Sequence, residues 1–490
     1  MINTVYELIT DVMAKQYPDR VAFRYVAADG KTVVEKTYAQ YVQDIRRAVT
    51  YFKENIPDIK GKRVGIMSRN CYEYGVNSFG AILAGAVVVT INQKKTWPEL
   101  EYELGLVEPS LIVNDGIDYG CRPDIEAAYG DKLRPMDAFK DSAPAELVDC
   151  VGHDDLMVLM FTSGTTGRSK GVMLSEKNYF TACQMYIDGQ KCVLDHEERL
   201  VPQYLDQTFS HFTLVPMFHL AGFICYFVYG IQGWTLNLCC DARDLRRDMS
   251  LMHSDAMSTP PVLVEMICNE VKRGHADRLN GLWNLSCSSA ILDPAILSDL
   301  VKNGFYINQC YSMTELAGYG LLNVTQEGDH LRALGKPDGF CEVKVDETGE
   351  ICVRGGCVML GYYKDPEATA ETIDKDGWLH TGDLARVDEE GYYYMTGRKK
   401  NLIILDSGEN VSPEELEKLL GKCDAIKECI VKEMGKKIGT VVCCEDDKQQ
   451  QVKAFVTELN RTLPMYKRIS VVECSTEPLP RNALGKLLRK

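Results

Sequence analysis

Short apolar runs bounded by turn residues alternate, along much of the chain, with longer segments in which apolar residues recur at helical spacing. The runs that read as strands are residues 64–67, 86–91, 111–113, 156–161, 212–215 and 234–238. Helical segments lie between several of them, for example residues 72–83 and 176–187. Because strands that alternate with helices form parallel sheets covered by helices, this pattern predicts an α/β fold.

The pattern changes from about residue 335 onward. Short strands separated by turns are expected at 341–345, 349–354 and 391–396, which indicates an antiparallel or barrel-like β region. Ser412 then begins a helix, because Pro413 suits the first helical position and Glu415 completes a capping box. We therefore expect a linker near residues 398–401 and a small mixed C-terminal domain after it.

Composition narrows the classes of function. The 55 Lys plus Arg and 70 Asp plus Glu residues give a net charge of −15. This argues against general nucleic-acid binding, which needs a basic surface, but not against a nucleotide site, which needs only local donors. The 19 cysteines include no C-x-x-C pair, so we expect reduced thiols, no zinc site and a cytoplasmic location.

Neither a membrane span nor a signal peptide is expected. The most apolar stretch, residues 220–231, is too short to cross a bilayer and reads as a buried helix. Residues 1–13 contain acidic side chains and lack a basic start.

The strongest local signal follows the apolar run 156–161 and reads Phe161-Thr162-Ser163-Gly164-Thr165-Thr166-Gly167-Arg168-Ser169-Lys170-Gly171. Its glycines let backbone N–H groups approach phosphate oxygens, its hydroxyls add donors, and Lys170 supplies a point charge. The spacing does not fit a Walker loop. A polar surface turn is the alternative interpretation, since clusters of Ser, Thr and Gly are often that.

This segment resembles the phosphate loop of the acyl-adenylate-forming superfamily, which includes acyl-CoA synthetases, adenylation domains of peptide synthetases and luciferases. Ser169 stands where that family usually has proline, which should alter the stiffness of the loop and remove no donor. Five further motifs follow in the family's order, so the resemblance covers the chain from about residue 35 to its end. The early segments 67–70 and 85–89 look most like those of fatty-acyl CoA ligases.

The resemblance implies a division of the chain into domains. A large N-terminal AMP-binding domain, 1–397, would hold two helix-flanked sheets and a barrel-like β subdomain at about 335–397. A hinge at 398–401 and a small mobile α+β domain at 402–490 would follow. Lys400 occupies the position about which the family rotates its small domain.

Two of the motifs are short. The segment 214–222 contains His219, which the resemblance places between the acyl chain and the nucleotide. Ser289 and Ala290 resemble the small-residue turn against which adenine lies. Taken alone, the histidine could equally be a satisfied core residue and the second motif an ordinary turn.

The segment 309–315 resembles the family's Tyr-Gly-x-Thr-Glu motif. Gln309 and Tyr311 belong to its nucleotide-binding set, and the tyrosine offers an aromatic face for adenine. Thr314 would donate to the α-phosphate, and Glu315 would hold Mg²⁺ through its hard carboxylate oxygens. Cys310 and Ser312 replace glycines of the family pattern, so the adenine edge or the floor of the acyl pocket should be narrower.

The last motifs lie towards the C-terminus. Asp383, within Gly377-Trp378-Leu379-His380-Thr381-Gly382-Asp383, resembles the aspartate that binds the ribose hydroxyls. Arg398 would add a ribose or phosphate contact, and Lys486 resembles the lysine that reaches into the site for adenylation. Their structural alternatives are a surface salt bridge and a solvated lysine.

Together the motifs imply that the protein activates a carboxylic acid with ATP and Mg²⁺ to an acyl-AMP, then transfers the acyl group to coenzyme A. Lys170, His219, Thr314, Glu315 and Lys486 would be the catalytic residues. An acyl or peptidyl carrier protein is an alternative acceptor. A catalytically silent nucleotide-binding protein and a light-emitting oxygenase are further alternatives. The acyl pocket should come from residues 209–223, 286–292 and 309–318, whose character suggests a fatty or other apolar acid.

Overall fold

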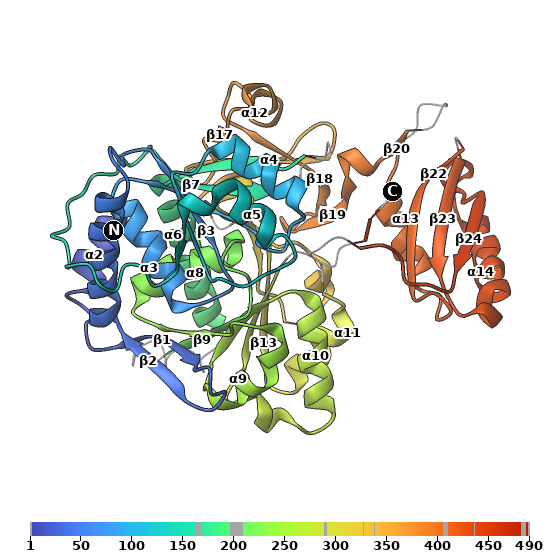
Figure 1. Cartoon of the computed structure of the whole chain (residues 1–490). Helices are drawn as coiled ribbons and strands as arrows, with labels where there is room; N and C mark the ends of the chain where they lie inside the picture. The colour runs from blue at the N-terminus through green and yellow to red at the C-terminus, as the bar shows by residue number, and fades with distance from the viewer. Residues whose placement is uncertain are drawn as a thin grey trace. The chain divides into compact units, whose positions relative to one another are not determined.

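The computed structural model describes the chain except residues 1, 163–167, 197–208, 289–291, 327, 338, 405–409, 436, 482–486 and 489–490, and the side chains of 190–196, 404 and 410. The chain forms two compact units (Figure 1). The first unit comprises residues 1–343 and 353–379, and the second comprises 344–352 and 380–490. The predicted domain boundary at 398–401 remains a prediction.

A seven-stranded sheet in the first unit has the order β17-β8-β7-β4-β3-β5-β6. Its parallel strands are β3 (Arg63–Met67), β4 (Val87–Thr90), β5 (Leu111–Asn114), β6 (Leu133–Pro135) and β7 (Leu156–Thr162). The antiparallel strands β8 (Lys170–Ser175) and β17 (Gly361–Tyr362) extend one edge. The strands predicted at 64–67, 86–91, 111–113 and 156–161 are confirmed as β3, β4, β5 and β7.

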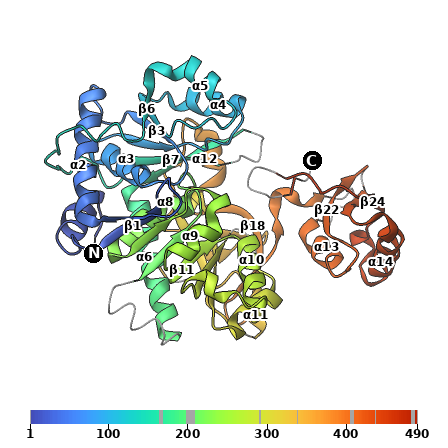
Figure 2. The ribbon, with the colours of Figure 1, turned by 60° about the horizontal axis from the view of Figure 1, so that its bottom comes forward.

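Helices accompany this sheet. They include α3 (Tyr72–Leu83), α4 (Trp97–Val107), α5 (Arg122–Tyr129) and α12 (Pro366–Thr372), and α2 (Tyr38–Asn55) packs on α3. α2 and α3 lie side by side (Figures 1 and 2). Their contact requires Gly80, because a Cβ atom there would lie 2.4 Å from the Cβ atom of Ala48.

An eight-stranded sheet in the same unit has the order β14-β13-β12-β11-β9-β10-β1-β2. Six strands are parallel: β1 (Val21–Val26), β9 (Ser210–Thr213), β10 (Thr235–Leu238), β11 (Ala256–Thr259), β12 (Asn284–Ser288) and β13 (Tyr306–Met313). The edge strands β2 (Val33–Thr37) and β14 (Gly318–Asn323) are antiparallel. The prediction of helix-flanked, mainly parallel sheets is therefore confirmed.

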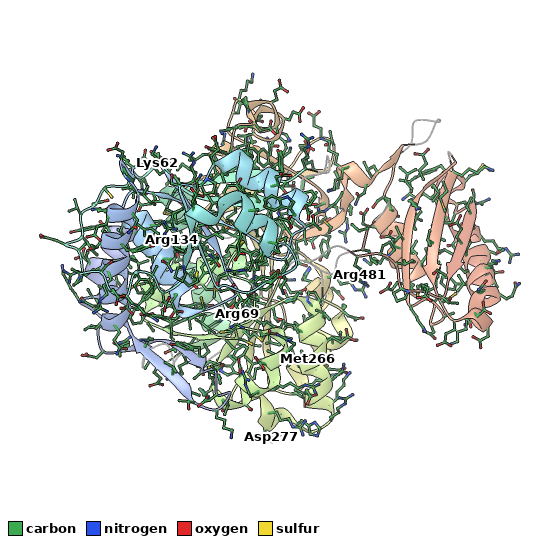
Figure 3. All side chains as sticks on the ribbon, viewed as in Figure 1. Lys62, Arg69, Arg134, Met266, Asp277 and Arg481 are labelled. Atoms are coloured by element: carbon green, nitrogen blue, oxygen red, sulfur yellow. The ribbon has the colours of Figure 1, made fainter. Side chains whose placement is uncertain are left out.

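One face of this sheet is covered by α9 (Leu245–Leu251), α10 (Pro261–Lys272) and α11 (Pro294–Lys302). The apolar core there joins Phe212, Met257, Leu285 and Ile307 of the strands to side chains of these helices. Met266 of α10, labelled in Figure 3, packs against it. The helices α6 (Glu176–His196) and α8 (Leu220–Gln232) also belong to the first unit. The predicted buried helix at 220–231 is confirmed.

The second unit contains most of a four-stranded sheet and a small α+β part. The four strands are β15 (Glu342–Val345), β16 (Glu350–Arg354), β18 (Leu379–Val387) and β19 (Tyr393–Arg398). The α+β part has β22 (Glu428–Met434), β23 (Lys437–Cys443) and β24 (Val471–Ser475), with α13 (Pro413–Leu420) and α14 (Gln449–Thr462) against one face. Ser412 caps α13 as predicted, with its Oγ accepting from the N–H of Glu415.

Two predicted absences can be compared with the described residues. Within them, no helix combines the length and the apolar character that crossing a bilayer requires. The cysteines described are all free thiols.

Candidate active site

The predicted phosphate loop joins two neighbouring antiparallel strands. Thr162 at the end of β7 lies directly opposite Lys170 at the start of β8. Ser163, Gly164, Thr165, Thr166 and Gly167, between them, lie outside the described residues. Register partners of an antiparallel pair point to the same face of the sheet, so the Thr162 hydroxyl and the Lys170 ammonium lie on one face.

Lys170 and Glu315 are brought together by a residue that the sequence did not single out. The Lys170 ammonium lies 4.7 Å from the centre of the Tyr362 ring, and the Tyr362 hydroxyl donates to Glu315 Oε1 at 3.0 Å. Burial and the neighbouring carboxylate raise the pKa of Tyr362 well above its usual range, so the hydroxyl stays a donor. Tyr362 belongs to the two-residue strand β17, which is too short to give a sequence signal.

Lys95 is a second functional candidate that sequence reasoning missed. Its ammonium lies 3.3 Å from the Ser169 hydroxyl and pairs with the buried Glu103 carboxylate. Burial raises the pKa of Glu103, and the lysine opposes this shift. The pair places a cation beside the described end of the phosphate loop. Its only sequence signal is a Lys94-Lys95 pair shortly after an apolar strand.

The 309–315 motif lies on β13 and the turn that follows it. Thr314 and Glu315 begin a short 3₁₀ turn, which Ala317 ends in the left-handed conformation with φ of 52°. Tyr311 lies near the carboxyl end of the strand. Tyr311, Thr314 and Glu315 therefore lie close together, at the carboxyl end of β13 and in the turn that follows it.

Both polar atoms of the Gln309 side-chain amide form hydrogen bonds within the fold. Its Oε1 accepts from the N–H of Leu292 at 3.1 Å, and its Nε2 donates to the carbonyl of Leu331 at 3.0 Å. The side chain therefore fixes the chain just after Ser289 and Ala290, which lie outside the described residues. We expect Gln309 to act on the adenine turn by positioning it.

His219 is the N-cap of α8, and its Nδ1 accepts from the N–H of Ala221 at 3.3 Å. This fixes the tautomer with the proton on Nε2, because Nδ1 is used as an acceptor. Burial lowers the pKa of His219, so the imidazole is neutral. The Thr90 hydroxyl donates to the carbonyl of Phe218 at 3.0 Å, which ties this segment to the end of β4.

The ribose candidates pair with each other in the second unit. Asp383 and Arg398 are cross-strand neighbours on β18 and β19, with Arg398 Nε 2.8 Å from Asp383 Oδ1. Asp383 is only 4% exposed, so this is not the surface salt bridge that was the structural alternative. The nearby Lys400, the hinge candidate, has a lowered pKa because of burial and of Arg398.

Lys486 lies outside the described residues, but the chain on both sides of it is described. Arg481 and Leu487, on either side of the segment 482–486, form an antiparallel bridge. Arg481, labelled in Figure 3, pairs with Glu428 of β22, and Leu479 packs with Ile430 and Cys443. The described residues on either side of Lys486 are therefore attached to the small sheet.

A potential metal-ligand group also occurs in the second unit. Among the described residues, Asp346, Cys352 and His380 bring their ligand atoms within 4.8 Å of one another. The Glu350 Oε2 atom lies 3.4 Å from His380 Nδ1 and 2.8 Å from the Lys399 ammonium. Because His380 and the Lys399 ammonium both lie against the Glu350 carboxylate, protein groups already partner part of this cluster, and we assign no metal there.

A cavity in the first unit lies between α6, α8 and the eight-stranded sheet. Its aromatic lining consists of Tyr186, Phe209, Tyr229, Trp234 and Tyr319. Phe209, His211, Ser286 and Cys310 come from the segments predicted to form the acyl pocket. The other lining residues, which the prediction did not include, come from α6, α8, β11 and β14 and comprise also Trp234, Asn284 and Asn308.

Comparisons with known proteins agree with these features. The chain matches the family described as AMP-binding enzyme over residues 11–363, and it therefore belongs to this family. The predicted membership in the acyl-adenylate-forming superfamily is confirmed. The chain is thus an enzyme of the AMP-binding family.

Individual relatives refine this assignment. The chain is 28% identical over 510 residues to 4-coumarate–CoA ligase 3 of Oryza sativa subsp. japonica, covering 96% of this chain and 89% of that protein. It is 27% identical over 515 residues to a long-chain-fatty-acid–CoA ligase of Escherichia coli O157:H7, covering 93% and 89%.

Among solved structures, the fold is similar to that of the O-succinylbenzoate coenzyme A synthetase (MenE) from Bacillus subtilis in complex with ATP and magnesium ion. The TM-score is 0.81 at 24% identity, with 99% of this chain and 98% of that chain covered. This similarity confirms the predicted fold class.

Proposed function

We propose that the protein is an acid–thiol ligase that uses ATP and Mg²⁺ to convert a carboxylic acid into an acyl-AMP and pyrophosphate, then forms the acyl thioester of coenzyme A. Family membership and relatives named as CoA ligases support this proposal. The observation that carries it is the junction of Lys170, Tyr362 and Glu315 beside the hairpin of the phosphate loop.

Adenylation is an in-line displacement in which the acid's carboxylate attacks the α-phosphorus and pyrophosphate leaves. Charge develops on phosphate oxygens, so fixed cations and donors dominate catalysis. Lys170 would neutralise the leaving phosphates, Thr314 would donate to the α-phosphate, and Thr162 would donate from the loop end. The Glu315 carboxylate offers a hard oxygen ligand suited to Mg²⁺, which supplies positive charge to the phosphates when bound.

Lys486 would pair with both the substrate carboxylate and the α-phosphate and so hold the two reactants together. The flanking residues Arg481 and Leu487 pair with each other, and Arg481 pairs with Glu428 of the small sheet. Lys486 would therefore move together with the small domain. Thiol transfer would then require the small domain to rotate about Lys400 and to remove Lys486 from the site. The segment 406–410 would line the thiol path; residues 406–409 and the side chain of 410 lie outside the described part of the chain.

The ribose would be held by Asp383, which accepts from its hydroxyls, with Arg398 beside it. The base would lie on Tyr311, next to the turn at Ser289 and Ala290 that Gln309 positions. The neutral His219 would separate the acyl group from the nucleotide. The acid itself would be fatty or otherwise apolar, which fits the aromatic lining of the cavity.

Coenzyme A is the proposed acceptor, and a carrier-protein phosphopantetheine is the second candidate because it presents the same thiol. The described cysteines are all free thiols, which favours the cytoplasm as the site of the reaction. An assay of thioester formation with coenzyme A alone separates the two acceptors. Product that forms only when a carrier protein is added would overturn the first.

The Lys486→Ala variant tests the reaction sequence. It should abolish acid-dependent pyrophosphate exchange while it still converts a supplied acyl-AMP to the thioester. Lys453→Ala, at an exposed position of α14, is the matched control and should leave both steps unchanged. Equal loss of both steps in Lys486→Ala would contradict the proposed role of this lysine.

The Lys400→Pro variant tests the hinge. It should retain adenylation and lose thioester formation, because proline fixes φ and blocks the backbone rotation. Normal thioester formation by this variant would remove the hinge assignment.

A further inference from the structure

In the eight-stranded sheet, the strands β9, β11, β12 and β13 have two chemically different faces. Met257, Leu285 and Ile307 point to the apolar core under the helices. The residues next to them in sequence point the other way, since side chains alternate along a strand. On that face, the cavity is lined by the polar residues His211, Ser258, Asn284, Ser286 and Asn308, together with Ala256 and Cys310.

These polar side chains form two rows across the strands. Ser258, Ser286 and Asn308 are register partners on β11, β12 and β13. In the adjacent row, Ala256 lies between its register partners His211 and Asn284. The rows touch, because Asn308 Nδ2 lies 3.5 Å from Asn284 Oδ1. Neighbouring strands are about 4.8 Å apart, so two neighbouring groups in a row can contact a single ligand group.

The histidine at one end of the second row is held in a fixed state. His211 is 1% exposed, its Nε2 accepts from the N–H of Ser258 at 3.2 Å, and its Nδ1 lies 2.8 Å from the Tyr229 hydroxyl. Burial lowers its pKa to about 3, so the imidazole is neutral. The described residues that line the cavity include no lysine, arginine, aspartate or glutamate. The polar wall is therefore uncharged.

The wall lies at a distance from the reacting carboxylate. The proposed function places that carboxylate at the α-phosphate beside Thr314, just past the adenine on Tyr311, and Asn308 is three residues before Tyr311 on the same strand. At about 3.3 Å per residue this is about 10 Å, and the row of Asn284, the register partner of Tyr306, is about 16 Å away. An acid that filled the cavity would bring its far end to the two rows.

We propose that these rows recognise an uncharged hydrogen-bonding group, such as a hydroxyl or a keto group, at the far end of an otherwise apolar acid. This inference rests on the proposed function and names the substrate class. A plain alkyl chain would offer no hydrogen bond to the donors and acceptors of the two rows that the Asn308–Asn284 contact does not use, which is costly. A site built to hydrogen-bond a hydroxyl rejects the analogue that lacks it. The absence of a carboxylate in the described lining also disfavours the ammonium of an amino acid.

The test uses matched pairs of acids that differ only in the far group: phenylpropanoic acid and its para-hydroxy form, and dodecanoic acid and its ω-hydroxy form. The readout is kcat/KM for pyrophosphate release with coenzyme A. In at least one pair the hydroxylated acid should be favoured by at least about tenfold. A carboxylate in the same position should be a poorer substrate than the hydroxyl.

Asn308→Leu removes the amide at nearly constant shape and should reduce that ratio to about one, chiefly by raising activity on the acid without the hydroxyl. Ser286→Ala is the second variant and should lower the ratio in the same direction. Asn303→Leu, at the exposed end of α11, is the matched control and should keep the wild-type ratio.

The proposal is overturned if the wild-type enzyme prefers the unsubstituted acid in both pairs, or if Asn308→Leu and Ser286→Ala lower both members of a pair equally. Pyrophosphate release with none of the acids, with or without coenzyme A, would instead be a failure of the proposed function. The two failures are therefore distinguishable.

Discussion

The two large sheets of the first unit differ in how they use their faces. In the seven-stranded sheet, the interior strands β3, β4, β5 and β7 are almost entirely apolar and buried on both sides. In the eight-stranded sheet, β11, β12 and β13 are apolar on the helix-covered face and polar on the face that lines the cavity. Parallel strands buried on both faces normally read as continuous apolar runs, so the second sheet is the exception.

The difference separates two tasks. The seven-stranded sheet carries the phosphate-loop hairpin at a strand end and needs only rigidity behind it. The eight-stranded sheet also forms a wall against which a ligand can lie, and that wall needs hydrogen-bonding groups. Changes to residues at the phosphate loop should therefore reduce the activity on all substrates to the same extent. Changes to the polar face should alter the choice of substrate and leave the fold intact.

The largest expected effect concerns the shared chemistry. Glu315→Gln should lower kcat by about 10²–10³-fold for every acid tested, because it removes the carboxylate that would hold Mg²⁺ beside the phosphates. It should also raise the Mg²⁺ concentration needed for half-maximal activity. Pyrophosphate release across the acid panel measures both, with Glu101→Gln on the exposed side of α4 as the control. A loss confined to some acids would contradict the separation of tasks.

The next effect compares the two faces of one strand. Leu285→Ala should lower the free energy of unfolding by about 2–5 kcal/mol, because it leaves a cavity in the packed core. Asn284→Ala, one residue earlier and on the cavity face, should cost less than about 1 kcal/mol. Denaturant unfolding measures both. Equal costs would mean that the cavity face is structural.

A smaller effect comes from His211 on β9. Its folded pKa of about 3 lies below the value of about 6.5 in an unfolded chain, so the unfolded chain takes up the proton first as the pH falls. Its contribution to stability is therefore complete above pH 6.5 and is lost towards pH 3, by up to about 1.4 kcal/mol per pH unit. His211→Gln should reduce this slope, measured as thermal unfolding from pH 7 to pH 4. An unchanged slope would show that the imidazole is not held neutral.

The smallest effect has the opposite sign and belongs to the seven-stranded sheet. Glu176 follows β8, is buried, accepts from the N–H of Val5 at 2.8 Å, and has its pKa raised to about 7 by burial. The unfolded carboxyl ionises above about pH 4.3, so stability falls as the pH rises from there to 7. Glu176→Gln should raise the unfolding midpoint at pH 8 by about 2–4 °C and have little effect at pH 4. A lower midpoint at pH 8 would contradict this.

The sequence predicted the seven-stranded sheet better than the eight-stranded one, for the reason that separates their functions. Apolar runs marked β3, β4, β5 and β7 closely. The predicted strand at 212–215 begins two residues after β9, because Ser210 and His211 belong to strand positions that are polar. Likewise α6 continues past the predicted end at 187, since Gly189 in its interior reads as a helix breaker.

The candidate site shows the same division. Contiguous motifs identified Lys170, Glu315, Thr314 and Asp383, because the chemistry they serve fixes residue types at fixed spacings. Tyr362 and Lys95 act through contacts with residues far away in sequence, so no local pattern marks them. The polar wall is assembled from alternate residues of four strands, and only the register of the sheet brings them together.

The most direct test of the account is a crystal structure of the enzyme with a non-hydrolysable acyl-AMP analogue that carries a far hydroxyl group. The account predicts phosphate contacts at Thr162 and Lys170, adenine on Tyr311, ribose on Asp383, and the hydroxyl within hydrogen-bonding distance of Asn308 or Ser286. A nucleotide bound away from these residues would contradict the proposed function. An acyl group directed away from the polar wall would contradict the assignment of the eight-stranded sheet to substrate choice.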